Sequence, residues 1–384
     1  FSNGYDDEMR VCFVVSDCNF FLTHRLDLAK VLLTKKLDVR LIASSNNTSE
    51  KDLLRIAALG IQLHEIPLRS QCASRIYGYF KYLISLRQTI KKINPEFIFY
   101  VTLEISVFGA WLNSFINTKK SFFLITGLGP FFFKKELKYR VARIIQKAVF
   151  NFSRIKKNYL FIFQNEDDLE VFTRLGFTQR KYANVIKGNG IDSKQFYYLE
   201  RDYNNEIIFL FASRLVYSKG IREFLMAART LAKLYPQAKF FIAGKYNNKD
   251  PDSISPNEYK LLQSDQALHY CGEVEHCDMN AFFTKASIFV MPSYGEGLPK
   301  VALEAAATGL PLIMSDVPGC RECVNDDVNG FTVEPRNTQD LKNKMELCIK
   351  MSDSMIDFGI NSSKLIKRDF AIELISEKYL KLLN

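Results

Sequence analysis

Two glutamates stand out in the segment YGEGLPKVALEAAATGLPLIMSD because their surroundings differ. Glu296 follows an apolar, strand-like run and precedes Gly297, Leu298 and Pro299, whereas Glu304 lies inside a segment with helical spacing. A helix that starts at such a proline offers free N–H groups, which attract phosphate. Carboxylates on either side could accept hydrogen bonds from sugar hydroxyls. The segment therefore predicts a site for a sugar nucleotide; the alternative is a surface loop followed by a solvated helical glutamate.

A pair of cations lies in a second loop of the same kind. In ASRLVYSKG, Arg214 follows a strand-like run and Lys219 precedes a helical segment. Two cations in a strand-to-helix loop suit a diphosphate, although arginine and lysine are also ordinary loop residues. Further candidates stand at comparable strand ends, at Gly244 and at the loop that contains Gly272 and Val274.

The elements that must position these loops alternate between strand and helix along the chain. This alternation is typical of α/β proteins with parallel sheets covered on both faces. The expected strands cover residues 9–17, 38–44, 61–68, 96–102, 121–127, 159–165, 206–214, 238–244, 268–274, 286–293, 310–316 and 330–335. The main expected helices cover residues 24–37, 51–60, 222–236, 299–308, 338–351 and 370–383.

The length of 384 residues and the renewed pattern after residue 206 indicate two doubly wound domains. We expect an acceptor-binding domain over 9–187, a nucleotide-sugar-binding domain over 188–365, and a C-terminal helix within 366–384 that packs back on the first domain. Ligands bind at the carboxyl ends of parallel strands. Two such domains, face to face, would enclose a cleft in which donor and acceptor meet.

Positive charge is concentrated in the N-terminal half. The net charge is +10, yet residues 69–92 alone carry +6 and residues 121–160 carry +8. Both windows mix aromatic and basic residues at helical spacing, which predicts helices that lie on anionic lipid. The alternative is a pair of packed helices with solvated basic faces. No nucleic-acid-binding motif accompanies the charge, so we expect no nucleic acid partner.

Composition and cysteine spacing exclude several other classes. No apolar run reaches the roughly twenty residues of a membrane-spanning helix, and residues 1–8 resemble an extension or tag remnant. The eight cysteines of this large chain are expected to be reduced. Neither the single CxxC at 320–323 nor the His/Cys group at 269–277 has the spacing of a zinc module. We therefore expect no metal and no cofactor.

The motifs of the C-terminal half together identify a family. ASRLVYSKG, FFIAGK, YCGEV, IFVMPSYGEGLPKVALEAAATGLPLIMSDVPGCREC and VNGFTVEP resemble the retaining glycosyltransferases of family 4, which have the GT-B fold. The resemblance covers residues 9–384 and is most specific over 206–335. It implies a nucleoside-diphosphate sugar, UDP-linked, as the donor substrate.

The resemblance also implies a role for each candidate residue. Glu304 would bind the ribose hydroxyls, and Glu296 would hold the donor hexose near its reactive carbon. Arg214 and Lys219 would neutralise the leaving diphosphate. The amides of Gly297 and Leu298 would contact the sugar or phosphate, and the loop that contains Gly272 and Val274 would hold the base. The other donor-side candidates are Pro299 and Gly244.

The first domain resembles, more loosely, bacterial enzymes that extend polyprenyl-diphosphate-linked glycans. The residues that carry this likeness lie in SDCNFFLTHRLDLAKVL, ITGLGPFF and FIFQNEDDLEVF. Many relatives have a glycine in the first loop, where this chain has Asp17-Cys18-Asn19-Phe20, and many have a histidine near Thr126. His24 is either a site residue or a satisfied histidine at a helix start. The acceptor-side candidates are Asn19, His24, Glu104, Thr126, Gly127 and Gly129.

The sequence thus predicts a metal-independent, retaining glycosyltransferase that moves a hexose or N-acetylhexosamine to a lipid-linked glycan. We expect it in the cytoplasm, attached peripherally to the inner face of the cytoplasmic membrane. Three alternatives stay open at this point: a sugar-nucleotide epimerase with the same fold, a transferase with a soluble acceptor, and a silent nucleotide-sugar-binding scaffold.

Overall fold

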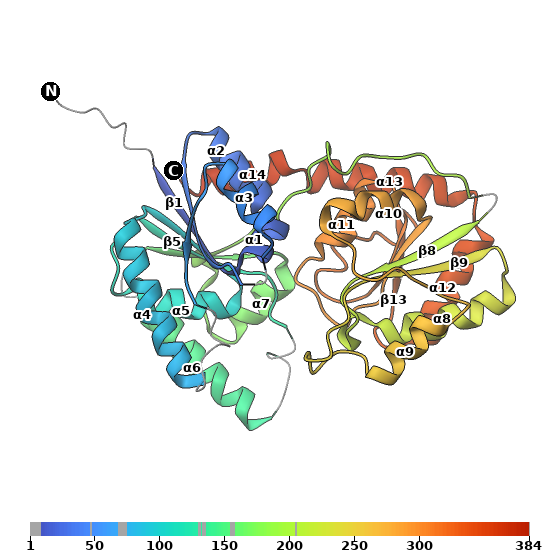
Figure 1. Cartoon of the computed structure of the whole chain (residues 1–384), viewed down its shortest axis with the longest axis horizontal. Helices are drawn as coiled ribbons and strands as arrows, with labels where there is room; N and C mark the ends of the chain where they lie inside the picture. The colour runs from blue at the N-terminus through green and yellow to red at the C-terminus, as the bar shows by residue number, and fades with distance from the viewer. Residues whose placement is uncertain are drawn as a thin grey trace. The chain divides into compact units, whose positions relative to one another are not determined.

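The computed structural model describes residues 9–46, 48–67, 75–129, 132, 136–153, 158–203 and 206–383. Contacts divide the chain into an N-terminal unit, which runs to Gly190 and resumes at Glu373, and a C-terminal unit from Ile191 to Ile372 (Figure 1). Cys72, residues 1–8 and parts of both basic windows lie outside the described residues.

The N-terminal unit is built on a seven-stranded parallel sheet with the order β3-β2-β1-β4-β5-β6-β7. Its strands are β1 (Arg10–Asp17), β2 (Asp38–Ser44), β3 (Gln62–Glu65), β4 (Phe97–Val101), β5 (Lys120–Ile125), β6 (Tyr159–Phe163) and β7 (Ala183–Val185). Its helices are α1 (Cys18–His24), α2 (Leu26–Thr34), α3 (Glu50–Ala58), α4 (Arg75–Ile93), α5 (Leu103–Asn113), α6 (Leu137–Ser153), α7 (Glu166–Arg174) and α14 (Ile372–Lys381).

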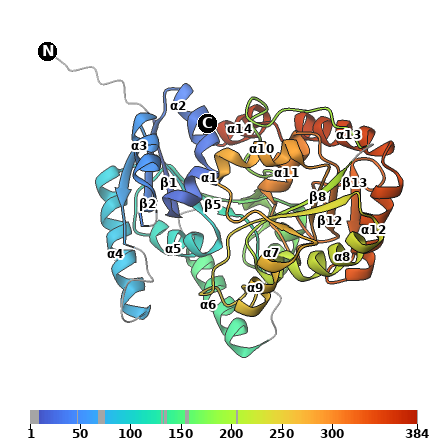
Figure 2. The same cartoon turned by 45° about the vertical axis from the view of Figure 1, so that its right-hand side comes forward.

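Helices cover both faces of this sheet, as both views show (Figures 1 and 2). Val11, Phe13 and Val15 of β1 pack with α1, α2, α3 and α14. Cys12 and Val14 point to the other face and pack with α4 to α7. Because successive strand side chains alternate between faces, a strand buried on both sides reads as a continuous apolar run.

The C-terminal unit repeats this plan with six parallel strands in the order β10-β9-β8-β11-β12-β13. Its strands are β8 (Ile207–Ala212), β9 (Ala238–Ala243), β10 (His269–Tyr270), β11 (Ile288–Met291), β12 (Leu312–Ser315) and β13 (Gly330–Val333). Its helices are α8 (Ile221–Leu234), α9 (Pro256–Ser264), α10 (Met279–Lys285), α11 (Lys300–Ala307), α12 (Thr338–Lys350) and α13 (Ser354–Asp369). One core lies under α8, α9 and α12, and another under α10 and α11.

Three local expectations were wrong. The segment Asp17 to Phe20 is not a loop, because Asp17 caps the N-terminus of α1 through its side chain and Phe20 N–H. His24 therefore ends a helix instead of starting one. The strand expected over 268–274 shrinks to β10, an edge strand of two residues.

Candidate functional site

Strand order brings the charged loops of the C-terminal unit together. β8 lies beside β11 at the centre of the sheet, where the crossover direction reverses. The loop after β8 carries Arg214 and Lys219, and the loop after β11 carries Glu296. Such a switch point is where open α/β sheets bind ligands, because the two loops leave the sheet in opposite directions.

The two loops are in direct contact. Tyr294 N–H donates to Ser218 O at 2.8 Å, and Lys219 Nζ pairs with Glu296 Oε1. The Glu296 side chain is only 11% exposed and that of Lys219 only 21%. This partial burial keeps the pair less screened by solvent than a surface ion pair. The ammonium group has three N–H donors, so it can hold Glu296 and an additional anion.

Tyr294 anchors the same loop from behind. Its hydroxyl donates to Glu223 Oε1 at 2.7 Å, on the first turn of α8, and burial together with this bond raises the pKa of Tyr294. The Arg336 guanidinium lies 4.6 Å from the centre of the Tyr294 ring. These contacts fix the loop that carries Glu296.

Gly319 allows a third loop to press against Glu296. Gly319 has φ +78°, and a Cβ there would lie 2.3 Å from Gly297 O and 2.6 Å from Glu296 O. The turn after β12 therefore packs closely against the carbonyls of Glu296 and Gly297. The neighbouring Cys320 is buried, and burial raises the pKa of its thiol.

Glu304 lies in the middle of α11 and is buried, with 2% of its side chain exposed. Its Oε1 lies 2.7 Å from His276 Nε2 and 3.5 Å from Lys300 Nζ. Pro299 precedes α11 as its N-cap residue, so the helix begins at Lys300. A solvated helical glutamate is thus excluded, because a buried carboxylate needs charged or hydrogen-bonding partners.

Arg201 holds the other end of α11. Its guanidinium donates to Thr308 O, Leu199 O, Phe283 O and Ala286 O, at distances of 2.5 to 3.0 Å. A cation near the last carbonyls of a helix is favoured by the helix dipole. The contacts tie the C-termini of α10 and α11 together and fix the helix that carries Glu304.

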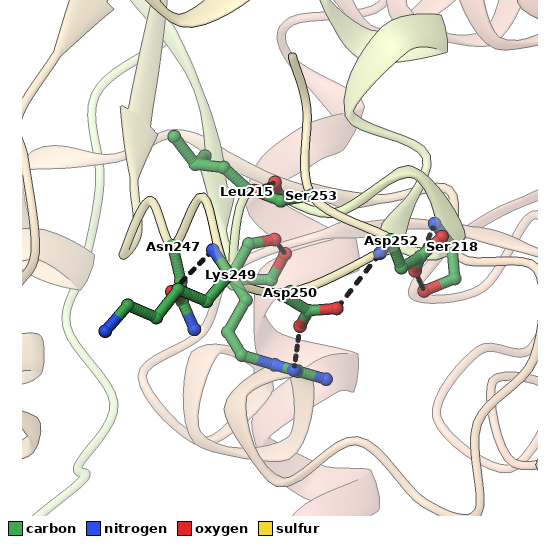
Figure 3. A network of polar contacts seen from close by, with 9 residues as sticks. Leu215, Ser218, Asn247, Lys249, Asp250, Asp252 and Ser253 are labelled. Atoms are coloured by element: carbon green, nitrogen blue, oxygen red, sulfur yellow. Dashed lines mark hydrogen bonds and ion pairs between the residues drawn. The ribbon is translucent and has the colours of Figure 1, made fainter. Parts of the chain in front are cut away.

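Arg214 has a different environment from Lys219. Its guanidinium is 63% exposed and lies 3.1 Å from Asp250. Asp250 belongs to a loop after β9, in which Asn247 and Asp250 accept backbone N–H bonds from Lys249 and Asp252 (Figure 3). Asp252 accepts from the backbone N–H and hydroxyl of Ser218, so this loop braces the loop between β8 and α8.

Gly244 joins the loops after three neighbouring strands. A Cβ at Gly244 would lie 1.7 Å from Ser213 O, and Gly244 N–H donates to Gly272 O at 2.7 Å. Val274 is partly buried against the core under α10 and α11, whereas Lys245 and Glu273 form an exposed ion pair at 2.9 Å.

The acceptor-side candidates lie after β1, β4 and β5, which are neighbours in the N-terminal sheet. Asn19 and Glu104 are exposed near the first turns of α1 and α5. His24 is half-buried and its ring centre lies 4.5 Å from that of Phe20. Thr102, before α5, has φ +83°, a rare conformation for a β-branched residue.

A buried carboxylate supports the loop with Thr126, Gly127 and Gly129. Asp168, on the first turn of α7, is 4% exposed and accepts a hydrogen bond from the backbone of Leu128. Burial raises its pKa to about 6, although this bond and one from Asn165 oppose the shift. Gly127 and Gly129 both have positive φ.

Sequence reasoning missed His276 and Lys300 as partners of Glu304. His276 was weighed only as a zinc ligand, and its contact with Glu304 spans 28 residues. Lys300 stands one helical turn before Glu304, so the i,i+4 spacing was a readable signal. Within the described chain, no three His, Cys, Asp or Glu side chains gather as metal ligands, and the described cysteines are free.

Two family models match the chain. The model described as "Glycosyl transferase 4-like" matches residues 10–165, and "Glycosyl transferases group 1" matches residues 199–365. N,N'-diacetylbacillosaminyl-diphospho-undecaprenol alpha-1,3-N-acetylgalactosaminyltransferase of Campylobacter jejuni is 27% identical, with 97% of this chain and 98% of the relative covered.

Solved structures show the same architecture. Sucrose-phosphate synthase from Thermosynechococcus elongatus superposes with a TM-score of 0.78 at 17% identity, with 98% of each chain covered. Anabaena HepE in complex with UDP-glucose gives a TM-score of 0.75 at 18% identity, with 98% of this chain and 99% of HepE covered. With both family models matched in sequence order and both sheets accounted for, the chain belongs to the family 4 glycosyltransferases and has the GT-B fold.

Proposed function

We propose that this enzyme transfers a hexose or N-acetylhexosamine from a UDP-sugar to a hydroxyl of a polyprenyl-diphosphate-linked saccharide, with retention of configuration. The observation that carries the proposal is the ion pair of Lys219 and Glu296 at the switch point. The buried Glu304 lies on α11, the next element along the chain. The Campylobacter relative, covered almost end to end, is named for a diphospho-undecaprenol acceptor and supports the same acceptor class here.

Each charged group has a role in this proposal. Glu304 accepts hydrogen bonds from the ribose, and Glu296 accepts from the transferred sugar. Lys219 and Arg214 stabilise the diphosphate as its bond to the anomeric carbon breaks, which is where negative charge develops. The acceptor oxygen bonds to the same face of that carbon, and its proton passes to the leaving diphosphate. Since two cations serve the diphosphate, we expect transfer without a metal ion.

A surface of the N-terminal unit favours attachment to a lipid bilayer. Helices α4 and α6 contain no acidic residue and carry several lysines and arginines. The exposed apolar residues of this surface are Phe80, Ile84, Trp111, Phe115, Leu137, Val141, Ile144, Ile145 and Phe152. The rings of Trp111 and Phe115, and of Phe115 and Phe152, lie 5.2 and 6.1 Å apart, and Arg87 lies 5.9 Å from Phe115.

We call this surface the α4–α6 face. Exposed apolar side chains beside cations suit the boundary between lipid headgroups and acyl chains. No helix of the described part of the chain is both long and apolar enough to cross a bilayer. We therefore propose peripheral attachment to an anionic leaflet, where a lipid-linked acceptor would reside.

The transfer proposal is tested by a donor screen. UDP-, GDP- and ADP-sugars are incubated with a polyprenyl-diphosphate-linked saccharide, with the same saccharide lacking the lipid, and without acceptor. We expect product only with a UDP-sugar and the lipid-linked acceptor, identified by mass and linkage analysis. Product on the free saccharide would indicate a soluble acceptor, epimer formation without acceptor would indicate an epimerase, and nucleotide binding without any turnover would indicate a scaffold.

The attachment proposal is tested by vesicle flotation at low salt. We expect binding to vesicles that contain phosphatidylglycerol and much weaker binding to pure phosphatidylcholine. The double variant Ile144→Ser/Ile145→Ser should bind less, whereas Leu261→Ser, an equally exposed change on α9, should bind as the wild type does. Absence of wild-type binding to the anionic vesicles would refute the attachment.

A further inference from the structure

The Glu304 carboxylate is held by two groups that differ in exposure. The His276 side chain is 30% exposed, whereas that of Lys300 is 8% exposed and that of Glu304 is 2% exposed. The histidine is also much closer, at 2.7 Å against 3.5 Å for the lysine. His276 therefore forms the strong hydrogen bond to this carboxylate, and it stands on the accessible side of the group.

His276 reaches Glu304 from a separate element. It opens a short 3₁₀ turn, His276–Asp278, four residues after Gly272 in the loop expected to hold the base. Its ring packs against Phe196, with centres 6.0 Å apart, and Phe196 packs against Phe283 of α10 at 6.1 Å. The ring is thus oriented by apolar contacts and by the loop, independently of α11.

The direction of the hydrogen bond follows from the chemistry. Glu304 Oε1 lies between His276 Nε2 and Lys300 Nζ, and a carboxylate only accepts hydrogen bonds. His276 Nε2 must then carry the proton, whether the ring is neutral or charged. A donor fixed on Oε1 restricts rotation of the carboxylate and leaves its other lone pairs in a defined direction.

We propose that His276 is a positioning residue that orients Glu304 for the ribose hydroxyls of the donor and links the base loop to α11. The inference rests on the proposed nucleotide-sugar site. Without this hydrogen bond, the Glu304 carboxylate is free to turn toward Lys300. The ribose hydroxyls then meet a carboxylate that is no longer pre-oriented. Loss of one charge-assisted hydrogen bond should weaken donor binding by about 10- to 100-fold.

A pair of amide variants separates positioning from mere bulk. Glutamine places its side-chain N–H₂ at about the reach of Nε2, whereas asparagine is one methylene shorter and cannot reach Glu304 Oε1. His276→Gln and His276→Asn are compared with Glu304→Gln. His269→Asn serves as the control, because His269 lies on β10 and contacts Phe241 instead. The probe is UDP, GDP or ADP, whichever the wild type binds most tightly by calorimetry.

We expect His276→Asn to weaken binding of the nucleoside diphosphate and to raise the donor KM by about 10-fold or more, with kcat changed less. His276→Gln should recover most of the affinity, and His269→Asn should match the wild type. Suppose that Glu304→Gln binds the nucleoside diphosphate more weakly than the wild type does. Wild-type affinity in His276→Asn, or equal weakening in both His276 variants, would then overturn the positioning role. Wild-type affinity in Glu304→Gln would instead overturn the proposed site itself.

Discussion

The substitution Gly319→Ala tests whether the turn after β12 positions the loop of Glu296. A left-handed residue with a Cβ costs roughly 1–2 kcal/mol. The added Cβ would also stand 2.3 and 2.6 Å from two backbone oxygens, where ordinary contacts begin at 3.4 Å. Since neither oxygen belongs to a flexible side chain, the backbone at Glu296 and Gly297 must shift by about 1 Å relative to the turn, a displacement that can cost roughly 100-fold in rate.

The assay is steady-state transfer together with denaturant unfolding. We expect Gly319→Ala to lose about 100-fold in kcat/KM and roughly 1–3 kcal/mol of stability. Gly60→Ala is the matched control, because Gly60 has the same φ of +78° and nothing within 4 Å of a Cβ. It should show the conformational strain without the loss of rate. A Gly319→Ala enzyme that turns over within about threefold of the wild type would refute this account of how Glu296 is held.

Three further expectations concern the supports of the site. Arg201→Met removes the donor shared by four carbonyls, of which, within the described chain, only Thr308 O and Phe283 O also accept a backbone N–H bond. It should destabilise the protein by about 2–4 kcal/mol, visible as a lowered Tm; an unchanged Tm would contradict it. Asp168 has a folded pKa of about 6, above its unfolded value, so its contribution to stability is present below about pH 4 and lost as pH rises through 6. Asp168→Asn should therefore gain stability relative to the wild type between pH 4.5 and 7.5, by up to about 3 kcal/mol in denaturant titrations, and a difference independent of pH would argue against it. Transfer should persist in excess EDTA, and a loss of turnover reversed by added divalent metal would show that Lys219 and Arg214 are not sufficient for the diphosphate.

The strands were the most predictable part of the fold. Runs such as EFIFYVT and EIIFLFASR are apolar on both faces because each sheet lies between two helix layers, and this leaves an unbroken signal in the sequence. The extent of β10 was predicted wrongly for the opposite reason, because β10 is a short edge strand with an exposed His269. The start of α1 was not predicted, because residues such as Asn19, Phe20 and Leu22 form no apolar stripe at helical spacing. Asp17, just before the helix, was nevertheless a recognisable N-cap.

The positions of the candidate donor-site residues on the fold were predictable, but most of the partners of these residues were not. Arg214, Lys219 and Glu296 lie in loops that follow strands, and Glu304 lies inside a helix. Local spacing is enough to identify such positions. The pairing of Lys219 with Glu296 spans 77 residues and depends on β8 lying next to β11. Sequence order alone does not fix that neighbour relation, since strand order is set by the packing of the whole sheet.

The most direct test of the central claim compares two lysine variants in the transfer reaction. Lys219→Met removes the cation paired with Glu296, whereas Lys233→Met removes an exposed cation in the last turn of α8. With both variants shown to be folded by circular dichroism, we predict at least a roughly 100-fold loss of kcat in Lys219→Met and wild-type turnover in Lys233→Met. Equal turnover in the two variants would contradict a diphosphate site at the switch point.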